Sequence, residues 1–294
     1  MFIRKKKVNG KYYYYAVKST RIDGKVKKYE RYIGLNPVPK KELKKYEKEF
    51  GQIKIFLANN KDKLDKIKKK YSEKINNASK DELANIEENI ITKFTYDTNR
   101  IEGSSLSFKD TKMLLQEGIS PKEKPIRDIK EAENHKRAYL FIKEYISKDI
   151  NEGFILQLHK ILKGNITEDA GSFRDAQVRV GNLIPVNAKL VKTEIENLIS
   201  WYNKNKKTLH ALELATIFHC IFERIHPFFD GNGRVGRLLL NFILLKRKYP
   251  TVIVQNKNKR RYYAALQKAD NGNYYYMLRY LFSEMEKQAK EYYS

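Results

Sequence analysis

Two apolar segments joined by a short glycine-rich loop constrain the fold of this chain more than any other feature of its sequence. Residues 211–225, ALELATIFHCIFERI, repeat apolar side chains at i, i+3 and i+4 spacing, which is typical of one face of a buried helix. A helical pattern resumes in residues 234–248, RVGRLLLNFILLKRK. The segment 226–237, HPFFDGNGRVGR, is therefore predicted to join two core helices, with its second half forming the first turn of the later helix.

Helical patterns also dominate the rest of the chain from Lys80 onward, with one exception. In residues 173–186, FRDAQVRVGNLIPV, valines alternate with polar residues before a Gly181-Asn182 turn, after which apolar residues return. We therefore predict a mainly α fold, in which residues 81–294 form an all-helical domain that carries one β-hairpin.

The first eighty residues differ from this domain in composition. Residues 1–36 alternate tyrosines and β-branched residues with lysines, and Asp23-Gly24 is a strong hairpin signal, which predicts a small basic antiparallel β element. Two prolines then break the pattern, and residues 37–80 place apolar side chains at helical spacing among many lysines. We interpret this second segment as linker helices.

Positive charge is concentrated in the same region. The net charge of the chain is +25, and residues 1–80 hold 25 Lys and Arg against 8 Asp and Glu. Such a surface favours a nucleic acid or an acidic protein as partner, and the exposed tyrosines of a basic sheet are suited to stacking on bases. Two simpler interpretations remain open, namely that the lysines are solvated faces and that the tyrosines serve packing.

The sequence also indicates a compartment. No apolar run approaches the roughly 20 residues that a membrane span needs, and the first residues do not lead into the apolar core of a secretory signal. The single cysteine, Cys220, lies in an apolar stretch and has no internal partner for a disulfide. We therefore expect a soluble cytoplasmic protein without a membrane partner.

Three known loop types fail to fit HPFFDGNGRVGR. The stretch 231–236 matches the dinucleotide pattern G-x-G-x-x-G, but a helix precedes it and residues 242–269 contain no acidic residue for a ribose. An EF-hand loop starting at Asp230 would need an oxygen ligand where Arg234 stands and a glutamate where Asn241 stands. A phosphate-binding P-loop would need Gly-Lys followed by Ser or Thr, which is absent.

The residues of the loop instead suit an anion. Gly231 and Gly233 permit a tight turn with bare backbone N–H groups, and the following helix directs the positive end of its dipole to the same place. Arg234 and Arg237 stand three residues apart on that helix and are able to clamp phosphate oxygens with forked hydrogen bonds.

Two further residues add chemistry to this loop. Asp230 suits Mg²⁺, which takes one or two carboxylates and fills its other positions with phosphate oxygens and water. His226 is able to accept a proton from an incoming hydroxyl near neutral pH. The alternative is that His226-Pro227 merely ends a helix before a solvated turn, which the clustering of so many phosphate-directed residues disfavours.

These residues resemble the signature of the Fic family, HxFx(D/E)GNGRxxR. The chain meets the pattern in full with the following residues: His226, Phe228, Asp230, Gly231, Asn232, Gly233, Arg234 and Arg237. The resemblance covers about residues 85–290 and does not extend to the N-terminal β element. It implies an all-helical core with a β-hairpin flap, and transfer of AMP from ATP to a protein Ser, Thr or Tyr hydroxyl with release of pyrophosphate.

The resemblance also implies a role for each residue of the signature. His226 would be the general base, and Asp230 would hold the Mg²⁺ (or Mn²⁺) that bridges the α- and β-phosphates. The residues expected to cradle or steady the phosphates are Gly231, Asn232, Gly233, Arg234 and Arg237. The flap would lie over the nucleotide and offer a strand edge to a target protein; its nucleotide-side residues are Val178, Arg179, Val180 and Gly181.

A later segment and an earlier one extend the resemblance. The stretch YYAALQKAD resembles the adenosine side, which makes Tyr262 and Tyr263 candidates, although the family often has Asn where this chain has Asp270. An ordinary core stripe remains the alternative for these tyrosines. Upstream, TNRIEG fits the inhibitory pattern (S/T)xxxE(G/N) within a helix expected around residues 85–103. Glu102 would pair with Arg237 and withdraw that arginine from the γ-phosphate.

The resulting functional hypothesis is a self-inhibited protein adenylyltransferase that modifies another protein or itself. Three alternatives stay open: removal of AMP from proteins, another nucleotidyl or phosphoryl transfer of the same family, and a nucleic-acid-binding regulatory protein with a secondary Fic domain.

Overall fold

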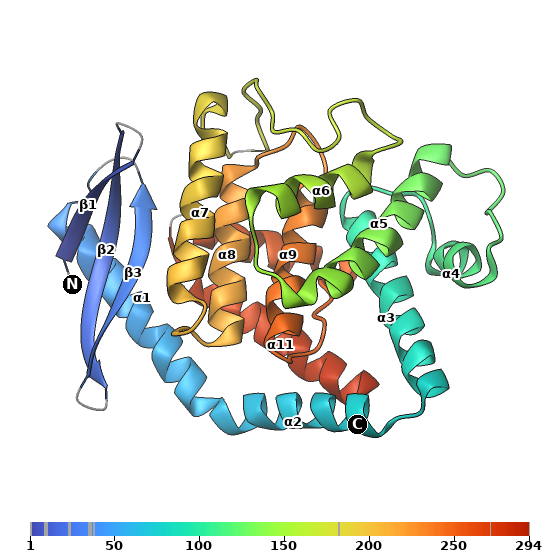
Figure 1. Cartoon of the computed structure of the whole chain (residues 1–294), viewed down its shortest axis with the longest axis horizontal. Coiled ribbons are helices and arrows are strands. Elements are labelled where there is room, and N and C mark those ends of the chain that lie inside the picture. Colours follow the sequence, from blue (N-terminus) through green and yellow to red (C-terminus); the bar gives the residue numbers. More distant parts are fainter. Residues whose placement is uncertain are drawn as a thin grey trace.

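The structure of the chain is a computed structural model that describes residues 2–8, 11–22, 25–34, 37, 39–181, 183–270 and 272–293. The expected turns at Asp23-Gly24 and at Asn182 lie outside these ranges. Helices make up most of the described chain, and a small antiparallel sheet stands at one end (Figure 1). The mainly α fold predicted from the sequence is confirmed.

The N-terminal region forms a three-stranded sheet in the order β1-β2-β3, with β1 at Phe2–Val8, β2 at Lys11–Ile22 and β3 at Lys25–Gly34. Neighbouring strands are antiparallel, and a register shift falls between Tyr14 and Tyr15. Tyr15 is buried and lines a small cavity together with Leu198 and Trp201, so one tyrosine of this sheet serves packing.

Two helices, α1 (Lys40–Asn59) and α2 (Lys61–Asn77), connect the sheet to the helical body. In Figure 1, α1 slants down from beside the sheet and α2 runs along the lower edge of the body, and both pack on the last helix, α11 (Tyr275–Tyr292). The ring of Phe56 meets that of Phe282 edge-on, and Ile53, Leu64 and Ile67 are buried in the main core. These predicted linker helices therefore bury their apolar face against the core of the following domain.

The remaining helices surround a central antiparallel pair, α8 (Ala211–Ile225) and α9 (Asn232–Lys246). The surrounding helices are α3 (Lys80–Ile101), α4 (Phe108–Glu117), α5 (Ile126–Glu144), α6 (Glu152–Lys163), α7 (Val191–Asn205) and α10 (Lys259–Asp270). Phe218 and Phe222 of α8 are fully buried, and burial of such a side chain contributes about 1.5–3 kcal/mol. The apolar face predicted for residues 211–225 is thus the centre of the core.

The predicted hairpin is much shorter than expected. Val180 and Leu183 exchange backbone hydrogen bonds of 3.0 and 2.9 Å, and this isolated pair is the whole ladder among the described residues of the segment. Side chains take the carbonyl groups that a second strand would pair: Arg174 donates to Val186, and Gln177 donates to Pro185. Because proline also lacks a backbone N–H, the ladder stops after one bridge.

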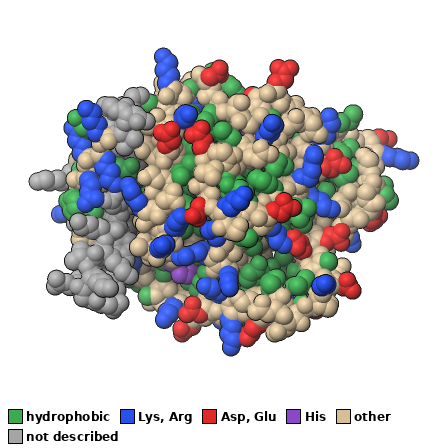
Figure 2. All heavy atoms as spheres, viewed as in Figure 1, with side chains coloured by type: hydrophobic (Ala, Val, Ile, Leu, Met, Phe, Trp, Pro, Cys, Tyr) green, Lys and Arg blue, Asp and Glu red, His purple; other side chains and the backbone are tan. Residues whose placement is uncertain are grey.

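Charge on the helical body is mixed. On the face in Figure 2, Lys and Arg side chains alternate with Asp and Glu side chains over the helices instead of forming one basic patch. Within the described ranges, no helix is both long and apolar enough to cross a bilayer.

Candidate active site

The glycine-rich loop lies between the two central helices, as the sequence predicts. Helix α8 ends at Ile225, and His226 caps it in the left-handed conformation with φ of 51°. Gly231 then turns the chain with φ of 80°, and α9 starts at Asn232. The backbone N–H groups of the first turn of a helix have no partner within the helix, so this turn presents donors for an anion.

Asn232 holds the loop together from inside. Its side chain accepts a hydrogen bond from the Phe228 backbone N–H and donates one to the Phe228 carbonyl, both at 2.8 Å. The Phe228 ring is fully buried and stacks on His159 at 3.7 Å between ring centroids. Both groups of the Asn232 side-chain amide are therefore used within the loop, and the predicted place of Asn232 in the phosphate cradle rests on its backbone N–H in the first turn of α9.

Gly233 faces Glu102 at the end of α3 directly. A side chain at this position would collide with the Glu102 carboxylate and approach the Arg237 guanidinium at 2.9 Å. A larger residue at this position would therefore require the Glu102 carboxylate or the Arg237 guanidinium to move.

Asp230 lies among cations at the mouth of this turn. One of its oxygens accepts a hydrogen bond of 2.7 Å from the Lys163 ammonium and one of 3.1 Å from Arg127. Its other oxygen accepts the Gly231 backbone N–H at 2.6 Å and lies 3.6 Å from Arg234. Burial raises the pKa of Asp230, but the hydrogen bond from Lys163 and the nearby positive charges outweigh it and lower the pKa to about 2.

Arg234 is engaged from two sides. It is almost fully buried, and its guanidinium lies 2.8 Å from the Glu131 carboxylate and 3.5 Å from the Asn99 side chain. Glu131 of α5 also contacts Lys163 at 3.1 Å. Arg234 therefore reaches the predicted phosphate site as a member of an ion-pair network and not as a free clamp.

Asp230 fits a divalent cation only in part. Among the described residues, no three His, Cys, Asp or Glu side chains are grouped as a metal cage would require. A single half-exposed carboxylate beside an anion-binding turn is nonetheless what Mg²⁺ uses when phosphate oxygens complete its coordination. The residues present thus fit a metal that is shared with a nucleotide.

His226 is neutral at physiological pH. Burial is the main reason that its pKa falls to about 4, and the nearby Arg174 acts in the same direction against the charges of Glu102 and Asp230. A neutral imidazole has a free nitrogen lone pair, so His226 is ready to accept a proton at pH 7.

Arg174 joins the flap segment to the loop. Its guanidinium donates to the carbonyls of His226 at 2.7 Å and Ala176 at 2.9 Å, and also to that of Val186. Its backbone N–H donates to the carbonyl of Pro227 at 2.9 Å. Sequence reasoning missed this residue, because nothing in its local spacing reports partners some fifty residues away.

The predicted flap residues are largely exposed. Val178 is partly buried, whereas Arg179, Val180 and Gly181 face solvent, and Arg179 donates a hydrogen bond of 3.1 Å to the Gly181 carbonyl. The Val178 carbonyl also accepts a hydrogen bond of 3.2 Å from Gln177, and both backbone groups of Val180 are used by the bridge to Leu183.

Glu102 and Arg237 meet as an ion pair. One Arg237 nitrogen lies 2.6 Å from a Glu102 oxygen and 3.3 Å from the Thr98 carbonyl, and Arg237 Nε donates to the Thr98 hydroxyl at 2.7 Å. Glu102 caps the C-terminus of α3 and Gly103 follows with φ of 98°, a conformation that favours glycine. The last turn of α3 thus occupies the guanidinium of Arg237 on two sides.

The two predicted adenosine-side tyrosines differ in exposure. Tyr262 is 1% exposed, and its hydroxyl lies 2.8 Å from a His219 ring nitrogen, so it belongs to the core behind Arg237. Tyr263 is 45% exposed and remains open to a ligand. Asp270 is partly buried, which raises its pKa. The prediction of Tyr262 as a contact residue is therefore not supported by its burial.

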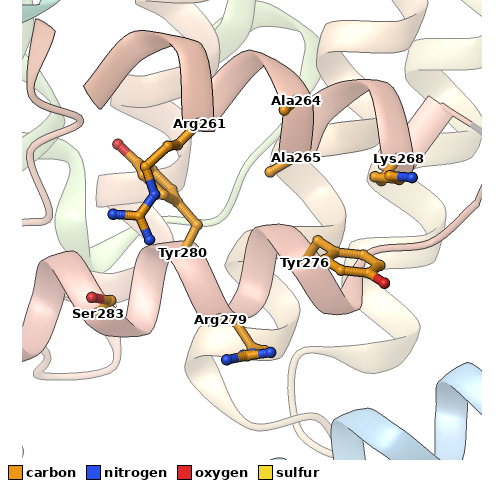
Figure 3. Close-up of a pocket in the computed structure, with 8 residues that line it drawn as sticks. All are labelled: Arg261, Ala264, Ala265, Lys268, Tyr276, Arg279, Tyr280 and Ser283. Atoms are coloured by element: carbon orange, nitrogen blue, oxygen red, sulfur yellow. The ribbon is translucent and has the colours of Figure 1, made fainter. Parts of the chain in front are cut away.

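A separate groove lies between α10 and α11 (Figure 3). It has a volume of about 440 Å³ and is bordered by Arg261 and Lys268 of α10 and by Tyr276 and Arg279 of α11. Arg261 and Lys268 are seven residues apart and therefore share one face of α10, whereas Tyr263 lies on the opposite face. This groove is thus distinct from the predicted adenosine side.

The class of protein follows from this arrangement: a helical body with a glycine-rich loop and a buried, neutral histidine between its two central helices. Residues 149–244 match the family model of the Fic/DOC family. The chain therefore contains a Fic domain.

Similar proteins include the protein adenylyltransferase fic-1 of Caenorhabditis elegans, 33% identical over 205 residues that span 68% of this chain and 40% of that protein. The protein adenylyltransferase Fic of Drosophila melanogaster is 31% identical over 196 residues, or 65% of this chain and 40% of that protein. The chain therefore spans about two fifths of the length of these curated relatives.

Solved structures agree with the fold. Residues 134–508 of Fic-1 from C. elegans superpose with a TM-score of 0.69 at 29% identity, covering 81% of this chain and 72% of that one. A Fic domain containing signaling protein from Bacteroides thetaiotaomicron has the same fold, with a TM-score of 0.71 at 24% identity, covering 77% of this chain and 95% of that one.

A buried carboxyl group beneath the loop makes the stability of the fold depend on pH. Glu223 is 13% exposed and lies against Gly236, and one of its oxygens has no hydrogen-bond partner among the residues that the structure describes. Burial raises its pKa to about 8, with the charges of Glu102 and Asp270 adding to the rise and that of Arg237 opposing it.

Glu223 is therefore expected to contribute a loss of stability as the pH rises from 5 to 8, because the folded chain keeps a proton on this carboxyl group that the unfolded chain has lost. Glu223→Gln, which carries no ionisable group, should remove up to about 1 kcal/mol of this decline per pH unit. Urea denaturation at pH 5, 6, 7 and 8 measures the effect. The exposed Glu117→Gln should leave the slope as it is; an equal slope for Glu223→Gln would contradict the assignment.

Proposed function

We propose that this chain is a self-inhibited protein adenylyltransferase, which transfers AMP from ATP to a Ser, Thr or Tyr hydroxyl of a protein and releases pyrophosphate. The observation that carries the proposal is the neutral His226 in the same loop as the anion-binding first turn of α9. The names of the similar proteins from C. elegans and D. melanogaster support it.

The chemistry needs one base and a set of charges. His226 accepts the proton of the target hydroxyl as its oxygen forms a bond to the α-phosphorus, and the bond from that phosphorus to the bridging oxygen of the β-phosphate breaks. The N–H groups at the start of α9 and the cations Arg234 and Lys163 stabilise the negative charge that remains on the phosphates. Pyrophosphate leaves with the electron pair of the broken bond.

Asp230 is the residue that would hold Mg²⁺ or Mn²⁺ together with the phosphate oxygens. When bound, the metal would neutralise phosphate charge during transfer. Tyr263 is the better candidate for the adenosine side, because Tyr262 is buried.

The inhibited state follows from the ion pair between Glu102 and Arg237. A guanidinium held at 2.6 Å by a carboxylate and at 2.7 Å by Thr98 has few donors left for a γ-phosphate. Because α3 belongs to the same chain, no second subunit is needed for this restraint.

The target protein is proposed to dock on the flap by adding a strand to the exposed backbone around Val180. The side chain of Val180 is 39% exposed and that of Ile184 is 70% exposed, which supplies an apolar edge for such a segment. The chain itself is a further candidate target. A cytoplasmic location is part of the same proposal, as is contact of the basic sheet with a nucleic acid or acidic partner.

Isotope position tests the reaction. Glu102→Gly protein incubated with Mg²⁺ and ATP labelled at the α-phosphate should acquire protein-bound label, and the same protein with ATP labelled at the γ-phosphate should acquire none. The double variant Glu102→Gly with His226→Ala is the control and should stay unlabelled. Protein-bound label from the γ position would identify a phosphotransferase instead, and loss of AMP from a pre-modified target would identify a de-AMPylase.

A further inference from the structure

The side chain of Lys163 is fully buried, and its ammonium contacts the Asp230 carboxylate. Lys163 is the last residue of α6. Its ammonium lies 2.7 Å from an Asp230 oxygen and 3.1 Å from a Glu131 oxygen. A buried lysine is costly unless it is paired, so these two carboxylates define its position.

The stem of Lys163 passes directly behind the loop. A side chain on Gly231 would meet Lys163 Cγ and Cδ at 3.5 Å, and His159 packs against the same position at 3.5 Å. The ammonium is thus delivered to Asp230 from the protein interior, on the side of the loop away from solvent.

The net charge around Asp230 disfavours binding of a metal ion without a nucleotide. Three cations, Lys163, Arg127 and Arg234, surround two carboxylates, Asp230 and Glu131, for a net charge of +1. A free divalent cation would approach a positively charged cluster in which one Asp230 oxygen already holds an ammonium. The four negative charges of ATP would reverse this balance.

We infer that Lys163 is the resident cation of Asp230, which excludes divalent metals from the empty site and attracts metal-free nucleotide. The metal then enters together with the phosphates, and Lys163 keeps Glu131 as its partner when Asp230 turns to the metal. This inference rests on the proposed function in one respect, namely that Asp230 is the metal ligand.

Two binding measurements on the full chain test the inference. Mn²⁺ binding without nucleotide is followed by electron paramagnetic resonance, and binding of a non-hydrolysable ATP analogue in EDTA is followed by equilibrium dialysis. Lys163→Met should bind Mn²⁺ at least about tenfold more tightly and the metal-free analogue at least about tenfold more weakly, as expected for loss of a buried unit charge a few ångströms away. A purely structural defect would weaken both.

Three further variants make the outcome decisive. Lys163→Gln keeps a donor for Asp230 without the charge, so it should repeat both changes if Lys163→Met folds poorly. Arg127→Met removes a cation that contacts the same oxygen but is 63% exposed, so water screening should limit its effect to less than about threefold. Adding Asp230→Asn to Lys163→Met should abolish the gain in Mn²⁺ affinity.

The inference is overturned if neither lysine variant binds Mn²⁺ more tightly than the unaltered chain, or if the gain persists with Asp230→Asn. Failure of the proposed function would appear separately, as absence of α-phosphate label in the Glu102→Gly protein.

Discussion

Replacing Glu102 by glycine should raise the rate of AMP transfer about 10- to 100-fold, the range that corresponds to a coupling of about 1–3 kcal/mol between two sites. The physical reason is that Arg237 loses its carboxylate partner at 2.6 Å and becomes free to bind the γ-phosphate. Initial rates of label incorporation at saturating ATP measure the change.

Two control variants separate charge from general loosening of α3. Glu102→Gln keeps the shape and one hydrogen bond but loses the charge, so its rate should lie between those of the parent and the glycine variant. Thr98→Val removes the other contact with Arg237, at 2.7 Å, and should have a smaller effect because that contact is neutral. The inhibitory role is rejected if Glu102→Gly binds ATP yet transfers AMP no faster than the parent chain.

The second large effect is expected at His226. In the Glu102→Gly background, His226→Ala should lower the rate about 10²- to 10⁴-fold, which is the usual contribution of a positioned general base. The affinity for ATP should change little, because the phosphates are bound by the turn of α9 and by cations and not by the imidazole. Single-turnover rates and nucleotide titration measure the two quantities separately.

The pKa of His226 adds a signature to this experiment. Because burial lowers the pKa to about 4, the base is present above that value and is lost only as the pH falls through it. The rate should therefore show no protonation step near 6.5 between pH 5.5 and 7.

His210 provides a matched control at the other end of α8. Its pKa is also lowered to about 4 by burial, but it caps the start of the helix and contacts Tyr249. His210→Gln should leave the rate within about threefold, as expected of a residue remote from the reacting atoms. Retention of more than a tenth of the activity by His226→Ala would exclude its role as the base.

Local patterns were sufficient to predict much of this protein. The apolar spacing of residues 211–225 and the glycines of the loop report on neighbours within a few positions, which is the range over which helix and turn formation are decided. For this reason the two central helices and the loop between them were predicted correctly. The predicted hairpin is shorter than expected because side chains, including that of Arg174, donate hydrogen bonds to its carbonyl groups.

Contacts between distant segments could not be predicted from such local patterns. Lys163 and Glu131 are 67 and 99 residues from Asp230, and no periodicity links α5 and α6 to the loop. The different exposure of Tyr262 and Tyr263 could not be predicted either, because they are adjacent tyrosines. Which of them is buried depends on which face of α10 packs against the core.

Residue spacing therefore predicts a phosphate site from the histidine, carboxylate, glycines and two arginines of the loop, and the resemblance to the Fic signature adds the inhibitory role expected of Glu102. The packing of α3, α5 and α6 around α9 decides which partner each charge has, with Arg237 on Glu102, Arg234 on Glu131 and Asp230 on Lys163. The reason is that Coulomb energy depends on distance and burial in space, and both are set only when helices far apart in the chain come together.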